Sequence, residues 1–310
     1  MLQIDGLRSF NVPGTHLAVV GYPIAHSISP IFQNAALQTM ARQYADLADW
    51  TYHKIEAPVE ELQQVIELTT SRGFRGLNLT LPHKVEVLPY LDRIDPVAKK
   101  MGAVNTLSFD SAGVTGYNTD GDGISRAIRH ALEIGVEGRA VVVLGAGGAS
   151  RAACVRFLEE GCSELWVGNR SLPRLESMLD HLRREYPGRA IHGFQSGLEL
   201  PEPSEDALLV QATSLGLKPD DPLPADDQLL SRVAYVYDMV YGRKPTPLVR
   251  AALRLGKPAS DGLPMLLYQG ARSLEIWTGL PVPVEAMAKA VARHHGKLDN
   301  VSVAERKATP

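Results

Sequence analysis

The fold of this chain is decided by the stretch Val141-Val142-Val143-Leu144-Gly145-Ala146-Gly147-Gly148-Ala149-Ser150. Its apolar residues predict a buried parallel strand, and the apolar spacing after Ser150 predicts a helix. Gly145 permits a tight turn, and Gly147 lets the backbone approach a pyrophosphate at the helix N-terminus, although Ser150 replaces the usual third glycine. This context favours dinucleotide binding over a simple tight turn. The expected cofactor-binding residues here are Gly145, Ala146, Gly147, Gly148 and Ala149.

The next predicted strand, Glu164–Val167, runs into Gly168-Asn169-Arg170-Ser171. An NAD site usually carries Asp or Glu at this place, where it binds the ribose 2′-hydroxyl. Here the position holds Asn169, with Arg170 beside it and Arg174 one turn further on. A guanidinium pairs with a 2′-phosphate that a carboxylate would repel. The pattern therefore favours NADP (NADPH), bound by Asn169, Arg170, Ser171 and Arg174, over a merely solvated helix start.

Length and composition exclude several classes of protein. The 310 residues suffice for two domains, and 45% hydrophobic with 22% charged residues excludes a disordered chain or a coiled coil. A net charge of −3 leaves no footprint for nucleic acid or an anionic membrane, and no apolar run is long enough to span a bilayer. The N-terminus lacks the apolar core of a secretory signal. We therefore expect a cytoplasmic protein that acts on a small molecule.

Metal and disulfide chemistry are not expected. Cys154 and Cys162 are the only cysteines, which is too few for a disulfide framework or a four-cysteine zinc site. Cys154 lies on the predicted helix after the glycine turn and reads as core packing. His26, His53 and His83 lack the spacing of metal ligands.

Alternating strand-like and helix-like segments predict an α/β fold with two domains. We expect an N-terminal α/β substrate domain with a mixed, mainly parallel sheet, and a C-terminal NADP-binding Rossmann domain. The predicted boundaries are 1–123, 124–260 and 261–310, the last part comprising C-terminal helices and a frayed polar tail from Lys297. Residues 1–14 give no clear signal. The expected strands are Thr15–Tyr22, Trp50–Glu56, Gly76–Leu81, Arg139–Leu144 and Val233–Met239, and Ala103–Phe109 and Val114–Asn118 are expected to form a hairpin. The expected helices are Pro58–Arg72, Asp95–Met101, Gly123–Gly135, one that starts at Pro82 and two within Pro264–Gly296. A further helix is expected to start at Ser29-Pro30, with Ser29 as its N-cap.

Further short motifs occur along the chain in a fixed order: Gly21-Tyr22-Pro23-Ile24-Ala25-His26-Ser27-Ile28-Ser29-Pro30, Asn78-Leu79-Thr80-Leu81-Pro82-His83-Lys84, Gly102-Ala103-Val104-Asn105-Thr106, Asn118-Thr119-Asp120-Gly121, Tyr237-Asp238-Met239-Val240-Tyr241 and Asp261-Gly262-Leu263-Pro264-Met265. Together with the glycine turn and Asn169-Arg170-Ser171, they resemble the shikimate dehydrogenase family from about residue 16 to residue 295. The resemblance implies NADPH-dependent reduction of 3-dehydroshikimate to shikimate in aromatic amino acid biosynthesis. It also implies a substrate domain before the nucleotide domain, with the C-terminal helices returning to the first domain.

The resemblance implies roles for individual residues. Lys84 and Asp120 are the implied catalytic pair that handles the proton of the substrate hydroxyl, although taken alone Lys84 reads as a surface charge and Asp120 as a helix N-cap. Substrate binding is implied for Ser27 and Ser29 at the carboxylate, for Thr80, Asn105 and Gln269 at the ring hydroxyls, and for Tyr241. Met239 is implied at the cofactor. The chain departs from the family pattern at Gln211, where Asn is usual, and at Pro264, where Gly is frequent.

Two alternatives remain open from the sequence. One is a quinate/shikimate dehydrogenase that uses NAD, which Asn169 and Arg170 disfavour. The other is a catalytically silent sensor of shikimate-like ligands, which the intact Lys84 and Asp120 disfavour. We expect a monomer or homodimer with no nucleic acid and no membrane partner.

Overall fold

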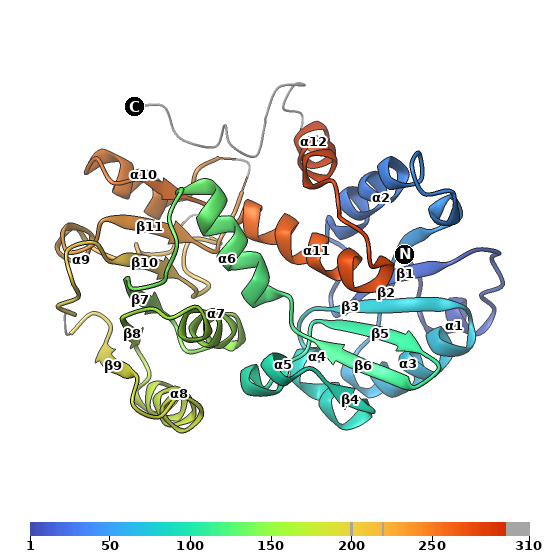
Figure 1. The fold of residues 1–310 in the computed structure, drawn as a ribbon, viewed down its shortest axis with the longest axis horizontal. Coiled ribbons are helices and arrows are strands. Elements are labelled where there is room, and N and C mark those ends of the chain that lie inside the picture. The colour runs from blue at the N-terminus through green and yellow to red at the C-terminus, as the bar shows by residue number, and fades with distance from the viewer. Residues whose placement is uncertain (199–200, 219, 243, 296–310) are drawn as a thin grey trace. The chain divides into compact units, whose positions relative to one another are not determined.

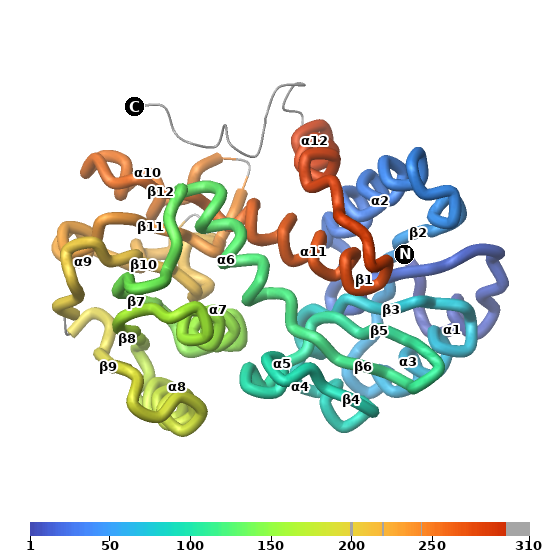
Figure 2. Tube along the Cα trace, viewed as in Figure 1, coloured from blue at the N-terminus to red at the C-terminus, as the bar shows by residue number. Residues whose placement is uncertain are grey.

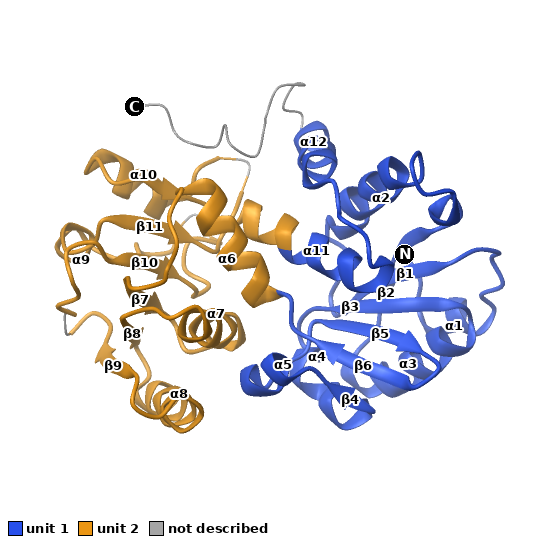
Figure 3. Cartoon of the chain, in the orientation of Figure 1, with its two compact units in different colours: residues 1–119, 269–302 blue, residues 120–268, 303–310 orange. Residues whose placement is uncertain are grey.

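The computed structural model describes residues 1–198, 201–218, 220–242 and 244–295, which form two compact α/β units (Figures 1 and 3). Residues 1–119 and 269–295 make up unit 1, and the described residues within 120–268 make up unit 2. Each unit contains one six-stranded sheet. The tail predicted from Lys297 lies outside the described residues.

The sheet of unit 1 has the strand order β2-β1-β3-β5-β6-β4. The pairs β1–β2, β1–β3 and β4–β6 are parallel, whereas β3–β5 and β5–β6 are antiparallel. The mixed, mainly parallel sheet and the hairpin are confirmed. The strands are β1 (His16–Gly21), β2 (Thr51–Glu56), β3 (Phe74–Leu79), β4 (Arg93–Ile94), β5 (Thr106–Asp110) and β6 (Gly113–Tyr117).

Helix α5 of unit 1 is capped at both ends. The Asp95 carboxylate accepts hydrogen bonds from Val97 N (3.0 Å) and Ala98 N (3.2 Å), and Gly102 ends the same helix with φ +62°. The helices are α1 (Ile4–Arg8), α2 (Ser29–Met40), α3 (Leu62–Ser71), α4 (His83–Glu86), α5 (Pro96–Met101) and α12 (Val284–His294), with 3₁₀ turns η1 (Ala45–Leu47), η2 (Val59–Glu61) and η3 (Leu88–Tyr90). Helix α11 (Leu263–Thr278) contains the boundary between the units, at residues 268 and 269.

The N-terminal segment is more ordered than its sequence indicates. Leu2 forms a parallel bridge with Ile55, and Leu7 on α1 is completely buried. A five-residue helix is too short to show a helical period, which explains why residues 1–14 gave no signal.

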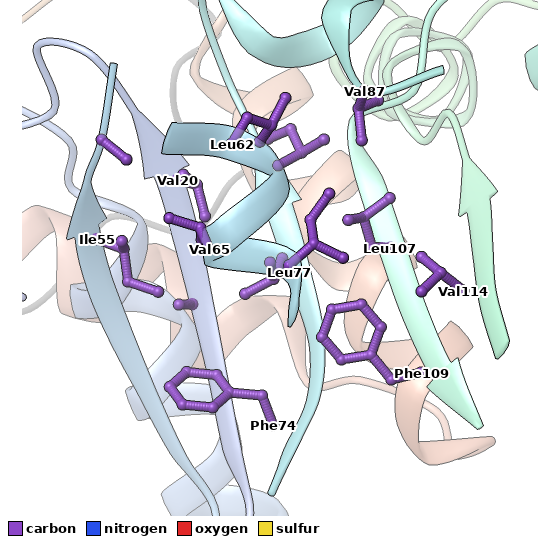
Figure 4. Close-up of a cluster of buried hydrophobic side chains, with 14 of the residues drawn as sticks. Val20, Ile55, Leu62, Val65, Phe74, Leu77, Val87, Leu107, Phe109 and Val114 are labelled. Atoms are coloured by element: carbon purple, nitrogen blue, oxygen red, sulfur yellow. The ribbon is translucent and has the colours of Figure 1, made fainter. Parts of the chain in front are cut away.

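The core of unit 1 lies between the sheet and α3 (Figure 4). Leu77 and Leu107 come from neighbouring strands, and Val65 comes from α3; none of these side chains is exposed. Burying one such side chain contributes about 1.5–3 kcal/mol before entropy is counted. This core fixes the sheet in which Thr80 directly follows β3 and Asn105 directly precedes β5, and Lys84 lies on α4 after β3.

Unit 2 is a doubly wound sheet in which every strand pair is parallel, with the order β12-β11-β10-β7-β8-β9 (Figure 2). This is the Rossmann order: the chain adds β8 and β9 on one side of β7 and then crosses back to add β10, β11 and β12 on the other side. The Rossmann prediction is confirmed. The elements are α6 (Asp120–Ala131), β7 (Ala140–Leu144), α7 (Gly148–Glu159), β8 (Glu164–Asn169), α8 (Leu172–Glu185), β9 (Ala190–Gln195), β10 (Leu208–Gln211), α9 (Asp227–Ser231), β11 (Tyr235–Asp238), α10 (Pro247–Arg254) and β12 (Ala259–Ser260).

Two local features hold the elements of unit 2 close together. A Cβ on Gly168 would lie 2.3 Å from the ring of Phe194, so glycine lets β8 and β9 bring that ring against the sheet. Arg156 on α7 donates to Glu160 (2.7 Å) and pairs with Asp122 (3.4 Å), which ties the first turn of α6 to α7. Cys154 is buried, as predicted for core packing.

Candidate active site

Ser27 and Ser29 lie at the start of α2, but the capping prediction for Ser29 is wrong. The helix begins at Ser29 with Ile28 as N-cap, and no side chain of the N-cap residue caps it. Instead Ser27 Oγ accepts a hydrogen bond from Ser29 N (3.3 Å) and donates to Ser29 Oγ (3.2 Å). The reason is that Pro30 fits the second helical position as well as the first. The two half-buried hydroxyls therefore form a pair beside a helix N-terminus, an arrangement suited to a carboxylate.

Lys84 is anchored on both sides by the backbone of unit 1. Its carbonyl accepts from Val104 N (2.8 Å), and the preceding His83 N donates to Thr80 O (2.9 Å). The fully buried His83 ring hydrogen-bonds Ala57 O through Nε2 (2.9 Å). Burial lowers the pKa of His83, which keeps that ring neutral around pH 7. The Lys84 side chain is half-buried on a short, firmly held helix.

Asn105 lies directly before β5 and links the start of that strand to Thr119, the residue that precedes Asp120. Its Oδ1 accepts from Thr119 N (2.8 Å) and from Thr106 Oγ1 (2.9 Å), and its Nδ2 donates to Thr119 Oγ1 (3.0 Å). Asn105 is 2% exposed. Inside unit 1 this amide fixes Thr119, and through it the point where the chain enters α6 at Asp120.

A buried polar network supports this edge of unit 1. Asn78 Nδ2 donates to Thr106 Oγ1 (3.0 Å) and to Ser273 Oγ (2.9 Å), while Asn78 Oδ1 accepts from Tyr52 OH (2.7 Å). Ser273 Oγ also donates to Gln269 O (3.1 Å), one turn earlier on α11. The network ties the backbone at Gln269, whose side chain is half-buried, to the strands that carry Thr80 and Asn105. Sequence reasoning missed Tyr52 and Ser273, because a lone hydroxyl in an apolar segment gives no signal of its partner.

The glycine turn of unit 2 leaves open space at a helix N-terminus. Gly145 has φ +116°, and a Cβ there would lie 2.9 Å from Ser150 Oγ and 3.0 Å from Ala212 O. Gly147, Gly148 and Ala149 are exposed, and a Cβ on either glycine would meet nothing within 4 Å. The first amides of α7 thus face an unfilled surface that fits a pyrophosphate. Ser150 at the third-glycine position is fully buried under the turn.

The end of β8 presents positive charge and no acid. Asn169 Nδ2 donates to Ser171 O (2.9 Å), which shapes the turn into α8, whose N-cap is Ser171. The first turn of α8 holds no acidic residue. Arg170 and Arg174 are exposed, and neither guanidinium is paired with any described residue. Two uncompensated guanidiniums at a helix N-terminus are disfavoured by the helix dipole, so the site suits a bound phosphate.

A cavity of about 290 Å³ opens beside this edge of unit 2, at the ends of β7 and β9. Ser196 N donates to Asn169 O (3.3 Å), so the cavity adjoins the Asn169–Arg170 segment. Its lining residues are mostly apolar: Leu144, Phe194, Ser196, Gly197, Leu198, Leu223, Pro224, Ala225, Asp226, Gln228 and Leu229.

The segment after β11 is held by its neighbours at Met239. Met239 N donates to Gln211 O (2.9 Å), and Tyr241, which follows, is 38% exposed. Burial of part of its ring raises the pKa of Tyr241, so its hydroxyl stays protonated at neutral pH. Gln211 is fully buried; its Oε1 accepts from Thr213 N and its Nε2 donates to Leu215 O (2.8 Å). The Gln that departs from the family pattern therefore shapes the loop after β10. Pro264, the second departure, lies near the start of α11 and is buried.

No group of three or more His, Cys, Asp or Glu side chains among the described residues is arranged to hold a metal ion. His83 bonds to a backbone carbonyl, and His53 bonds to the ring of His16 (3.1 Å). None of the described helices is long and apolar enough to cross a membrane.

Comparison with known protein families gives two matches. Residues 19–107 match the shikimate dehydrogenase substrate binding domain, and residues 262–292 match the shikimate 5′-dehydrogenase C-terminal domain. The first match covers the segments that contain Ser27, Lys84 and Asn105.

Curated relatives and solved structures agree with these matches. The chain is 37% identical over 277 residues to the shikimate dehydrogenase (NADP(+)) of Geobacter metallireducens, which covers 89% of this chain and 95% of that protein. It is 40% identical over 294 residues to the shikimate dehydrogenase (NADP(+)) of Rubrobacter xylanophilus, covering 94% and 98%. The structure of shikimate 5-dehydrogenase from Thermus thermophilus in complex with NADP(H) and shikimate superposes with a TM-score of 0.77 at 34% identity, covering 91% and 99%.

Proposed function

Because this chain belongs to the shikimate dehydrogenase family, we propose that it catalyses the reversible reduction of 3-dehydroshikimate to shikimate with NADPH. The observation that carries the proposal is the similarity along nearly the whole length of relatives with that activity. The reaction places the enzyme among oxidoreductases that act on a secondary alcohol.

The residues of unit 2 fit the cofactor. The open surface over Gly147 and Gly148 accommodates a pyrophosphate, and Arg170 and Arg174, which pair with none of the described residues, suit a 2′-phosphate. When bound, NADPH supplies the hydride. Met239, whose amide is fixed by Gln211, lies at the carboxyl end of β11, where a doubly wound sheet binds its ligand.

Proton transfer is assigned to Lys84 and Asp120. Reduction of the ketone develops negative charge on its oxygen, and a positioned donor must neutralise that charge. The Lys84 ammonium serves as this donor, and Asp120 stabilises the charged ammonium and orients it. In the reverse direction the same pair takes the proton of the alcohol. The backbone anchors of Lys84 and the Asn105–Thr119 bonds restrict the motion of both residues.

Substrate binding is assigned to neutral side chains and to the start of α2. Ser27 and Ser29 bind the carboxylate through their hydroxyls, helped by the helix dipole. Thr80, Asn105 and Gln269 bind ring hydroxyls, because hydroxyl and amide groups both donate and accept. The hydroxyl of Tyr241, which stays protonated, adds a further donor.

Initial rates test the proposal. Shikimate and quinate are each supplied as substrate with NADP⁺ and with NAD⁺, and reduction of the cofactor is followed by absorbance. We expect the highest kcat/KM for shikimate with NADP⁺. A preference for quinate with NAD⁺ would identify the quinate/shikimate enzyme instead. Absence of turnover in all four mixtures, together with measurable shikimate binding, would identify a silent sensor.

A further inference from the structure

The proposed mechanism leaves unused a buried carboxylate at the carboxyl end of β11. Asp238 is 1% exposed and lies directly before Met239. The pKa of Asp238 is raised to about 6, chiefly by burial and to a smaller extent by the nearby Asp261, while hydrogen bonds from Thr246 and Val240 lower it in part. A buried ionisable group costs free energy, so a neutral side chain would be the cheaper choice at a purely structural position.

Both oxygens of this carboxylate have defined partners. Oδ1 accepts from Val240 N (3.0 Å), and Oδ2 accepts from the hydroxyl of Thr246 (2.6 Å). Thr246 is itself buried and is the N-cap of α10, where its Oγ1 accepts from Val249 N (3.2 Å). The carboxylate therefore joins the turn after β11 to the first turn of α10 and fixes both ends of the segment that contains Tyr241.

Gly262 also restrains the turn at Met239 and Val240, through backbone contacts. Gly262 N donates to Val240 O (3.1 Å), and a Cβ on Gly262 would lie 2.0 Å from Met239 O. Backbone atoms cannot yield as a flexible side chain can, so Gly262 is required for this close approach. The turn at Met239 and Val240 thus has one orientation, set by Gln211, Gly262 and Asp238.

We propose that Asp238 is a positioning residue: its carboxylate, held by Thr246, orients Met239 toward the cofactor and Tyr241 toward the substrate. The inference rests on the proposed function and extends it to a residue that touches neither ligand. A carboxylate accepts hydrogen bonds about twice as strongly as a neutral group, which explains an ionised residue at a point where two segments must be held in register.

The experiment uses three variants of the full chain and a matched control. Thr246→Val removes the hydroxyl that donates to Asp238, Thr246→Ser restores it, and Asp238→Asn removes the charge with little change in shape. Asp95→Asn is the control, because Asp95 also caps a helix through two backbone amides and lies outside the proposed catalytic and binding residues. For each variant we measure kcat, KM for shikimate, Tm, and hydrogen exchange of the Val240 amide.

We expect Thr246→Val and Asp238→Asn to raise KM for shikimate or lower kcat at least five-fold and to accelerate exchange at Val240 at least ten-fold. Thr246→Ser should stay within two-fold of the wild type, and Asp95→Asn should lower Tm without changing KM. Unchanged kinetics and unchanged exchange in both Thr246→Val and Asp238→Asn would overturn the proposal. If the wild type itself does not oxidise shikimate, the proposed function fails. In that case slow exchange at Val240 in the wild type and fast exchange in Asp238→Asn would still establish the ordering role of the carboxylate.

Discussion

Replacing Arg170 by alanine removes one of two exposed guanidiniums at the start of α8. The change is small in structural terms, because this guanidinium is unpaired with any described residue of the folded chain. The backbone of Arg170 stays fixed, since its carbonyl accepts from Gln195 Nε2 (3.3 Å). The free energy of unfolding should therefore change by less than about 0.5 kcal/mol.

The effect on cofactor binding should be far larger. A hydrogen bond to a charged group contributes about 1.5–3 kcal/mol, and each 1.4 kcal/mol or so is a factor of ten in affinity. Exposure to solvent places Arg170 toward the lower end of that range. We expect KM for NADP⁺ to rise about 10- to 30-fold and KM for NAD⁺, which lacks the 2′-phosphate, to change less than about two-fold.

The assay compares KM and kcat with both cofactors at low and high salt. Arg184→Ala is the matched control, because Arg184 is an exposed arginine in the last turn of the same helix, about 15 Å from Arg174 along the axis. It tests whether loss of any positive charge has the same effect. Equal increases of KM for NADP⁺ and NAD⁺, or an equal effect of Arg184→Ala, would refute the assignment of Arg170 to the 2′-phosphate.

Three further outcomes are expected. Lys84→Ala should lower kcat at least 100-fold with a smaller change in KM, because it removes a group needed mainly in the transition state; steady-state kinetics that keep most of kcat would exclude Lys84 as the proton donor. Gly262→Ala should lower Tm and kcat together, as measured by thermal unfolding and initial rates, because its Cβ would lie 2.0 Å from Met239 O; a variant with wild-type Tm would disprove this close approach. Asp238 should make the protein more stable as pH falls from 7.5 toward 4.5, since its folded-state pKa of about 6 exceeds the ordinary value of 3.8 and the folded state binds the proton first. The full difference corresponds to at most about 3 kcal/mol, and urea unfolding at the two pH values should show that Asp238→Asn lacks this part of the pH dependence.

The sequence predicted those parts of the fold that rest on local patterns. The strand-turn-helix at Gly145, the hairpin and the short helix that ends at Gly102 each depend on residues within a short stretch, and the structure contains all three. The order of strands in unit 2 followed from the Rossmann pattern.

The parts that the sequence did not predict depend on contacts between distant residues. Asn78 meets Ser273 across 195 positions, and nothing near either residue signals the other. The surroundings of the buried Asp238 likewise include Thr246, eight positions away at the N-terminus of α10, and Asp261. Ser29 was assigned the wrong role because a serine before proline fits both an N-cap and the first helical position, and only the backbone angles distinguish the two.

Unit 1 cannot be completed until helix α11, which lies near the end of the chain, has been synthesised. Trp277 donates from Nε1 to Leu107 O (2.8 Å), and Gln33 donates to Gly270 O (3.1 Å), so the first sheet is completed by residues made near the end of translation. A nascent chain that has emerged only as far as α10 carries every strand of both sheets except β12, yet it lacks the helix that covers one face of the earlier sheet. On the ribosome, the N-terminal sheet therefore keeps apolar surface exposed until α11 has been made, and chaperones can protect that surface during this period.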